Sequence, residues 1–249
     1  MNILIVNDDG IDSIGIRILC EVITEKTDWS IYVFAPDVEK SASAAAMSLH
    51  KELSIVENKE FKGVEKAFSV IGGFPVDCSK IAFSFLKDTF DISPDMIISG
   101  INNGENTGID LRYSGTVNAA FEGLERKIPS FALSLAMVKK DDVEGFYRAA
   151  SFLVEYIIDN KENLRTDILY NFNYPDLDNI KGVKETHPAE FFYKEYYLFE
   201  KKKKNGQYRA ILKGERVFEK DDSPDSDLGA VANGYVSLTK LKPEFLYEK

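Results

Sequence analysis

The start of the chain combines a short apolar run with two adjacent carboxylates, and this combination most constrains the fold. Residues 3–6 are all apolar, a run too short for a buried helix but suited to a strand covered on both faces. Asn7-Asp8-Asp9-Gly10 follow directly. Ligands of open α/β sheets bind beyond the carboxyl ends of the strands, so Asp8 and Asp9 are candidate site residues. Their mutual repulsion favours a bound cation, although the same four residues also suit an ordinary turn.

Strand and helix patterns alternate along the first 175 residues. The expected strands cover residues 3–6, 29–35, 53–56, 67–71, 96–98, 130–135 and 168–172, and the expected helices cover residues 14–26, 76–86, 118–126 and 142–159. Such alternation predicts an α/β fold: a Rossmann-like, mainly parallel sheet with helices on both faces and right-handed crossovers. Residues 1–175 are therefore the predicted catalytic core.

The remaining residues, 176–249, form a predicted C-terminal extension. Two strand-like runs flank Asn205-Gly206, which is a strong hairpin signal, so we expect a β-hairpin over about residues 190–218. The lysine run before that turn suits a solvated hairpin tip. A long hairpin has little of its own to bury against, which favours pairing with another subunit. The acidic residues 219–227 suggest a loop, and residues 234–239 a terminal strand.

Composition narrows the possible partners. The 249 residues include 31 Lys and Arg against 41 Asp and Glu, a formal net charge of −10. A surface this acidic argues against binding a nucleic-acid polymer, but not against a small phosphorylated substrate next to a metal ion. No signal peptide or membrane span is recognisable, and Cys20 and Cys78 lie in apolar segments that suit free thiols. We expect a soluble, cytoplasmic protein.

Residues 37–48 are polar or small and follow the second expected strand. They therefore fall on the same sheet edge as Asp8 and Asp9, where Ser41 could supply a hydroxyl to a site. The alternative is a short alanine-rich helix at residues 44–47, which helix propensity favours. Both hold if Ser41 lies just before such a helix.

Residues 99–108 contain three glycines four apart with asparagines between them. The spacing matches neither the dinucleotide fingerprint nor the phosphate-binding P-loop. Asparagine oxygens can bind a hard cation without adding charge, although a plain turn explains the composition equally well.

Ser114-Gly115-Thr116 opens the next expected helix. Free backbone N–H groups, two hydroxyls and the positive end of the helix dipole could together bind an anion. Ordinary N-capping by Ser114 or Thr116 is the simpler interpretation.

Taken in order, these motifs resemble the SurE survival-protein family of metal-dependent nucleoside-monophosphate phosphatases. They are Asn7-Asp8-Asp9-Gly10, Ala35-Pro36-Asp37 followed by Ser41, Ser99-Gly100-Ile101-Asn102 with Gly104, Asn106 and Gly108, and Tyr113-Ser114-Gly115-Thr116-Val117. Pro75, Asp77 and Cys78, and the run Gly234-Tyr235-Val236-Ser237, are also similar. The resemblance covers about the first 135 residues and the last twenty or so.

The resemblance implies a Rossmann-like core and a C-terminal arm exchanged between subunits of a homodimer or homotetramer. It implies one divalent metal ion per subunit, magnesium or manganese, bound by Asp8, Asp9, Ser41 and Asn102. Asp8 and Asp9 are then also the expected catalytic residues. It further implies that Asn106, Ser114, Gly115 and Thr116 bind the substrate phosphate.

The sequence departs from the family pattern at four positions. Ala44 and Ala45 stand where the family has Gly-His or a similar polar pair, Phe74 where a threonine is common, and Lys240 where a proline usually follows. The metal ligands are intact, so these changes bear on substrate preference and turnover more than on phosphatase chemistry.

The expected activity is hydrolysis of nucleoside monophosphates as a 5′-nucleotidase, with 3′-nucleotides and polyphosphate as open alternatives. The nucleophile is either water beside the metal or a carboxylate of Asp8 or Asp9. A non-catalytic nucleotide- or phosphate-binding protein is the second hypothesis. An acidic receiver-type signalling domain is the third, and it predicts a shorter chain without the glycine–asparagine loop.

Overall fold

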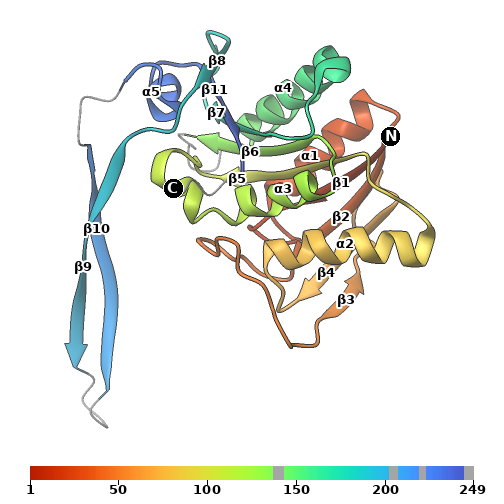
Figure 1. The fold of residues 1–249 in the computed structure, drawn as a ribbon, viewed down its shortest axis with the longest axis horizontal. Coiled ribbons are helices and arrows are strands. Elements are labelled where there is room, and N and C mark those ends of the chain that lie inside the picture. Colours follow the sequence, from red (N-terminus) through yellow and green to blue (C-terminus); the bar gives the residue numbers. More distant parts are fainter. Residues whose placement is uncertain (137–142, 202–206, 219–222, 244–249) are drawn as a thin grey trace, which may run out of the picture.

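A mainly parallel sheet forms the centre of the molecule (Figure 1). The computed structural model describes residues 1–136, 143–201, 207–218 and 223–243. Within these residues the sheet has nine strands in the order β3-β4-β2-β1-β5-β6-β7-β11-β8. Their bounds are β1 Asn2–Val6, β2 Ser30–Pro36, β3 Ser54–Glu57, β4 Lys66–Ile71, β5 Met96–Asn103, β6 Ser130–Ala136, β7 Leu169–Pro175, β8 Val183–Thr186 and β11 Val236–Leu241. The predicted α/β, Rossmann-like fold is confirmed.

The strand order reverses next to β1. The chain passes from β1 to β2 and β4 on one side, and then returns to place β5, β6 and β7 on the other. β1 pairs in parallel with both β2 and β5. The carboxyl ends of β1 and β5 therefore form the topological switch point, which is where open α/β sheets bind ligands.

Helices cover both faces of the sheet (Figure 1). α1 (Ile14–Lys26) and α4 (Glu144–Asn160) pack on one face, and α2 (Pro75–Phe90) and α3 (Gly115–Glu125) pack on the other. Because side chains alternate along a strand, Ile3 and Ile5 join the first core while Leu4 and Val6 join the second. The described part of the chain contains no helix that is long and apolar enough to cross a membrane.

A two-stranded antiparallel hairpin of β9 (Phe191–Lys201) and β10 (Tyr208–Phe218) projects away from this body (Figure 1). The predicted Asn205-Gly206 turn and most of the lysine run before it lie outside the described residues. After the hairpin the chain returns to the sheet, where β11 lies antiparallel to β7 and parallel to β8. The division into residues 1–175 and 176–249 stays a prediction.

Three details differ from the expectations. Residues 44–47 form a turn followed by irregular backbone instead of a helix: Ala44 has a φ of 48°, and its N–H donates to the carbonyl of Tyr113 at 2.9 Å. The short helix α5 (Asp227–Ala232) begins at the end of the acidic segment predicted as a loop, of which residues 219–222 are not described. β8 was not predicted. The 3₁₀ turns η1 (Gly108–Arg112) and η2 (Lys161–Asn163) complete the described elements.

Candidate active site

Asn7 folds the loop that follows β1. Its side-chain amide donates to the carbonyl of Gly10 at 2.9 Å and to the hydroxyl of Ser13 at 2.8 Å, while its Oδ1 accepts from the Gly10 N–H at 3.2 Å. Gly10 has a φ of +92°, and a Cβ there would lie 3.1 Å from the Val38 backbone, so glycine suits the position. The loop therefore turns tightly and leaves Asp8 and Asp9 at the sheet edge.

A cavity of about 300 Å³ lies at the switch point. Its lining residues are Asp8, Asp9, Glu39, Ser41, Ala42, Asn102, Asn103, Asn106, Asp110, Tyr113 and Ser114. All four predicted metal ligands and two of the predicted phosphate-binding residues thus share one cavity. The other two, Gly115 and Thr116, are buried directly behind it, against Asp8.

A larger hollow of about 510 Å³ lies at the opposite end of α3, between residues such as Phe83, Lys87 and Arg126. α3 has 11 residues, so the two hollows are separated by about 16 Å of helix. The larger one has a single carboxylate, Asp88, in its wall. It therefore lacks the paired acids that distinguish the cavity at the switch point.

The two aspartates of the smaller cavity carry perturbed pKa values. Burial raises the pKa of Asp8, against the lowering effect of Thr116, whose hydroxyl donates to Asp8 Oδ1. Burial and then the charge of Asp8 raise the pKa of Asp9 to about 6, although the Asn103 N–H donates to its Oδ2 at 3.1 Å. The Glu39 carboxylate raises both values further. A cation in the cavity would relieve this repulsion.

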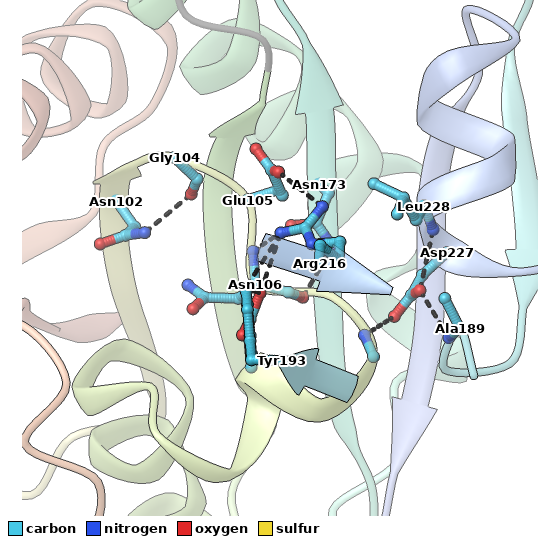
Figure 2. A network of polar contacts seen from close by, with 12 residues as sticks. Asn102, Gly104, Glu105, Asn106, Asn173, Ala189, Tyr193, Arg216, Asp227 and Leu228 are labelled. Carbon is cyan, nitrogen blue, oxygen red and sulfur yellow. Dashed lines mark hydrogen bonds and ion pairs between the residues drawn. The ribbon is translucent and has the colours of Figure 1, made fainter. Parts of the chain in front are cut away.

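The donor atoms suit a hard divalent cation. The Asn102 amide nitrogen donates to the Gly104 carbonyl at 2.7 Å (Figure 2). This hydrogen bond holds the Asn102 side chain in place, while its Oδ1 remains a potential metal ligand. Ser41 donates to Glu39 at 2.5 Å and keeps its oxygen lone pairs. Two carboxylates, a hydroxyl and an amide oxygen form an all-oxygen set of the kind that binds magnesium or manganese. Among the described residues, no three Asp, Glu, His or Cys side chains form a metal cluster, so the predicted set depends on its two neutral ligands.

The start of α3 lies against the carboxylates. Ser114 is the N-cap, and its Oγ accepts from the Val117 N–H at 3.0 Å, as the simpler interpretation predicted. A Cβ at Gly115 would lie 2.6 Å from the Ser43 hydroxyl and 2.8 Å from Asp8 Cβ. The positive end of the helix dipole therefore abuts the predicted cation site with no side chain between them.

Comparison with known proteins shows the family of the chain. The family model described as "Survival protein SurE" matches residues 3–195. The chain belongs to the SurE family. A protein of Clostridium beijerinckii named "5′-nucleotidase SurE" is 39% identical over 251 residues, covering 98% of this chain and 94% of that protein. A protein of the same name from a Synechococcus strain is 38% identical over 246 residues, covering 98% of this chain and 92% of that protein.

A solved structure has the same architecture. The crystal structure of the SurE protein from Aquifex aeolicus superposes with a TM-score of 0.79 at 29% identity, covering 99% of this chain and 95% of that one. The predicted resemblance to the SurE family is confirmed.

Within this SurE fold, Asn106 is fixed by buried polar contacts from the sheet. Its backbone N–H donates to Asn173 Oδ1 at 2.7 Å (Figure 2), and its side chain donates to Ser134 at 2.8 Å. Its carbonyl accepts from the amides of Asn171 and Asn173, both at 3.1 Å. Neither β7 asparagine was predicted, because both alternate with apolar residues in a strand and carry no motif.

Several residues at the cavity were not predicted as site residues, and three of them carry a carboxylate or a hydroxyl close to the paired aspartates or the start of α3. Glu39 and Asp110 line the cavity, and the Oγ of Ser43 is buried beside Gly115 without a hydrogen-bond partner in the described structure. Ser43 lies two residues after Ser41, which is the only signal in the sequence. Its position depends on the path of the loop, which the pattern of residues 37–48 does not specify.

Proposed function

We propose that this chain is a metal-dependent phosphomonoesterase that hydrolyses nucleoside monophosphates to nucleoside and phosphate, with 5′-nucleotides as its main substrates. One observation supports this most: the paired carboxylates Asp8 and Asp9 and the start of α3 meet at one cavity. A cation site next to an anion site is what phosphate-ester hydrolysis requires. The names of the relatives, "5′-nucleotidase SurE", support the substrate class.

In this proposal Asp8, Asp9, Ser41 and Asn102 hold one magnesium or manganese ion per subunit. When bound, the ion would act as a Lewis acid that polarises the phosphoryl oxygens of the substrate. Thr116 holds Asp8 in place through its hydroxyl, and Asn103 holds Asp9 through its backbone N–H. These contacts fix both carboxylates before substrate arrives.

The phosphate group binds at the other wall of the cavity. Gly115 contributes a backbone N–H in the first turn of α3, and its lack of a side chain lets the phosphate approach that backbone closely. Ser114 and Asn106 contribute polar side chains from the cavity wall. Thr116 links the two sites, since it lies in the first turn of α3 and donates to Asp8. The helix dipole stabilises negative charge as it develops on the transferring group.

A substrate panel tests the proposal. Phosphate release is measured with 5′- and 3′-nucleoside monophosphates and with polyphosphate, each with manganese and then with a chelator. We expect the highest kcat/KM with 5′-nucleotides and no release in the chelator. Binding of nucleotides without any release would instead support the non-catalytic alternative, in which Ala44, Ala45 and Phe74 mark lost activity.

The nucleophile is tested by a single turnover in water enriched in oxygen-18. Both aspartates are held by hydrogen bonds and face a charged cavity, which favours attack by water over attack by Asp8 or Asp9. We therefore expect the label in the released phosphate together with inversion of configuration at phosphorus, because an aspartyl-phosphate opened by water at phosphorus would also label the phosphate but with net retention. Label in a protein carboxylate would show direct attack by that side chain.

We also propose that the chain assembles as a homodimer or homotetramer through the hairpin. The exposed apolar side chains of β9 and β10 are Phe192, Tyr196, Tyr197, Leu198, Phe199, Tyr208 and Leu212, and Phe199 is 71% exposed. An apolar patch of this kind on a projecting element is typical of an interface.

Two further expectations belong to this proposal. The buried Cys20 and Cys78 are free thiols, which suits the reducing cytoplasm. The net charge of −10 supports a small phosphorylated substrate over a nucleic-acid polymer.

A further inference from the structure

The base of the hairpin contacts the loop that forms one wall of the cavity. Arg216 on β10 and Tyr193 on β9 are directly paired across the hairpin. Arg216 Nη2 lies 3.2 Å from Asp110 Oδ2, and the Tyr193 hydroxyl donates to the same oxygen at 3.0 Å. Arg216 Nη1 also lies 3.5 Å from Glu105 (Figure 2). Two strands of the hairpin thus converge on Asp110, a residue of the cavity wall.

The guanidinium group is held in place from several sides. It stacks over the ring of Phe191 at 4.6 Å and lies 5.8 Å from the ring of Tyr193. The side chains of Arg216, Glu105 and Asp110 are only 26%, 28% and 22% exposed. A partly desolvated arginine shared between two carboxylates and two rings orders the groups around it more strongly than a surface ion pair does.

Asp110 also connects the hairpin to the start of α3 through its backbone. Its backbone carbonyl accepts the N–H of Tyr113 at 2.9 Å and the N–H of Ser114 at 3.0 Å. Ser114 is the N-cap of α3, the helix whose first turn abuts Asp8. An unbroken series of hydrogen bonds therefore runs from the hairpin through Asp110 to the proposed phosphate site.

We propose that Arg216 is a positioning residue for substrate binding: by holding Asp110, it fixes the N-terminal end of α3 at the place where the phosphate binds. This inference rests on the proposed function. It assigns the hairpin a role in the geometry of its own subunit's active site, in addition to any role in assembly.

The test compares Arg216→Ala with the wild type in two measurements. The first is steady-state kinetics with a 5′-nucleoside monophosphate and manganese. A displaced phosphate site weakens ground-state and transition-state binding together, so we expect KM to rise by about tenfold, with kcat changed less than about threefold. A variant that is merely part-unfolded shows a lower apparent kcat at unchanged KM, and that result would overturn the inference.

The second measurement is amide hydrogen exchange of the Ser114 N–H in the protein without metal or substrate. We expect this amide to exchange faster in Arg216→Ala, because its acceptor on Asp110 is no longer held. This readout does not depend on activity. If the wild type releases no phosphate, the proposed function fails, while the exchange rate at Ser114 still decides whether Arg216 positions α3.

Three matched variants show whether an effect of Arg216→Ala comes from the lost contact to Asp110, from the lost positive charge or from impaired folding. Arg209→Ala removes an exposed arginine from the same strand and should leave KM and exchange at wild-type values. Arg216→Lys keeps the positive charge but has a single ammonium group in place of the forked guanidinium, so its KM should lie between those of the wild type and Arg216→Ala. Should Arg216→Ala not fold, Tyr193→Phe keeps the ring packing, removes the 3.0 Å contact to Asp110, and should still raise KM and Ser114 exchange. Wild-type KM and exchange in both Arg216→Ala and Tyr193→Phe would overturn the proposal.

Discussion

At the scale of single residues, Gly115 shows how closely the two halves of the site approach. A Cβ at this position would lie 2.6 Å from Ser43 Oγ and 2.9 Å from Asp8 Oδ2, so one of these groups must move. We expect Gly115→Ala to fold but to lower kcat/KM for phosphate release by about 100-fold, since small displacements of reacting groups cost this much. Glu125→Ala, at the exposed end of the same helix, serves as the control. Wild-type kcat/KM in Gly115→Ala would contradict the proposed site.

Asp9 gives the site a pH dependence. In the metal-free protein its pKa is raised to about 6, whereas in the unfolded chain it is about 4. Between these values the folded chain holds a proton that the unfolded chain has lost, so this group's contribution to stability falls as pH rises from about 4 to 6. Asp9→Asn removes that loss. In chelator, the difference in Tm between Asp9→Asn and the wild type should therefore change in favour of the variant when the pH is raised from 4.5 to 7.

The exposed Asp12→Asn serves as the control for this experiment, because its side chain is 77% exposed. A Tm difference between Asp9→Asn and the wild type that is the same at both pH values would contradict the assignment. Manganese should also raise the wild-type Tm more at pH 7 than at pH 5, because protons compete with the metal for the Asp9 carboxylate.

At the scale of elements, Asp227 connects the C-terminal extension to the site loop. Its carboxylate accepts the N–H groups of Gly108 at 2.9 Å and of Ala189 and Leu228, both at 2.8 Å (Figure 2). Asp227→Ala leaves buried N–H groups unsatisfied, so it should lower the free energy of unfolding by about 3 kcal/mol in urea titrations. Asp225→Ala, which removes an exposed carboxylate nearby, should change it little. Equal effects of the two substitutions would contradict this structural role.

The elements that the sequence predicted well are those with a strong apolar period. α1 covers Ile14–Lys26 as expected, because its apolar residues recur at helical spacing and pack on the sheet. β8 is short and only partly apolar, and it forms because β11 offers it an edge. α5 depends on Ser226, whose Oγ accepts from the Gly229 N–H, within an otherwise acidic segment. The β8–β11 pairing is a tertiary contact that leaves no local pattern, whereas the Ser226 cap of α5 is a local signal that lies beside acidic residues typical of a loop.

The same distinction applies to the site. The resemblance to the SurE family predicted Asp8, Asp9 and Asn102 as one ligand set, and the structure brings them together because they lie at the carboxyl ends of β1 and β5, which pair in parallel. Ser41 was predicted to join them from the loop after β2, and it does line the same cavity. Arg216 comes from the distant hairpin, whose packing against η1 no local motif indicates.

At the scale of the whole molecule, the projecting hairpin predicts an assembly. Phe199 is 71% exposed and so adds little to the stability of a single subunit. We expect Phe199→Lys to keep the fold but to raise the dissociation constant of the oligomer by about 30-fold or more, as for an aromatic hot spot. Sedimentation velocity over a range of concentrations measures this, with Glu200→Gln on the same strand as the control. An unchanged association would contradict an interface at this face of the hairpin.

The central claim is that Asp8 and Asp9 at the end of β1 hold a metal ion for hydrolysis of a phosphate ester bound at the start of α3. The most direct test is phosphate release from a 5′-nucleoside monophosphate by the wild type and by Asp8→Asn, each with manganese and with chelator. The account predicts release by the wild type with manganese, at least about 1,000-fold above Asp8→Asn and above the chelated protein, since metal and carboxylate supply several kcal/mol of transition-state stabilisation. Equal release by the wild type and Asp8→Asn, or release that persists in the chelator, would contradict it.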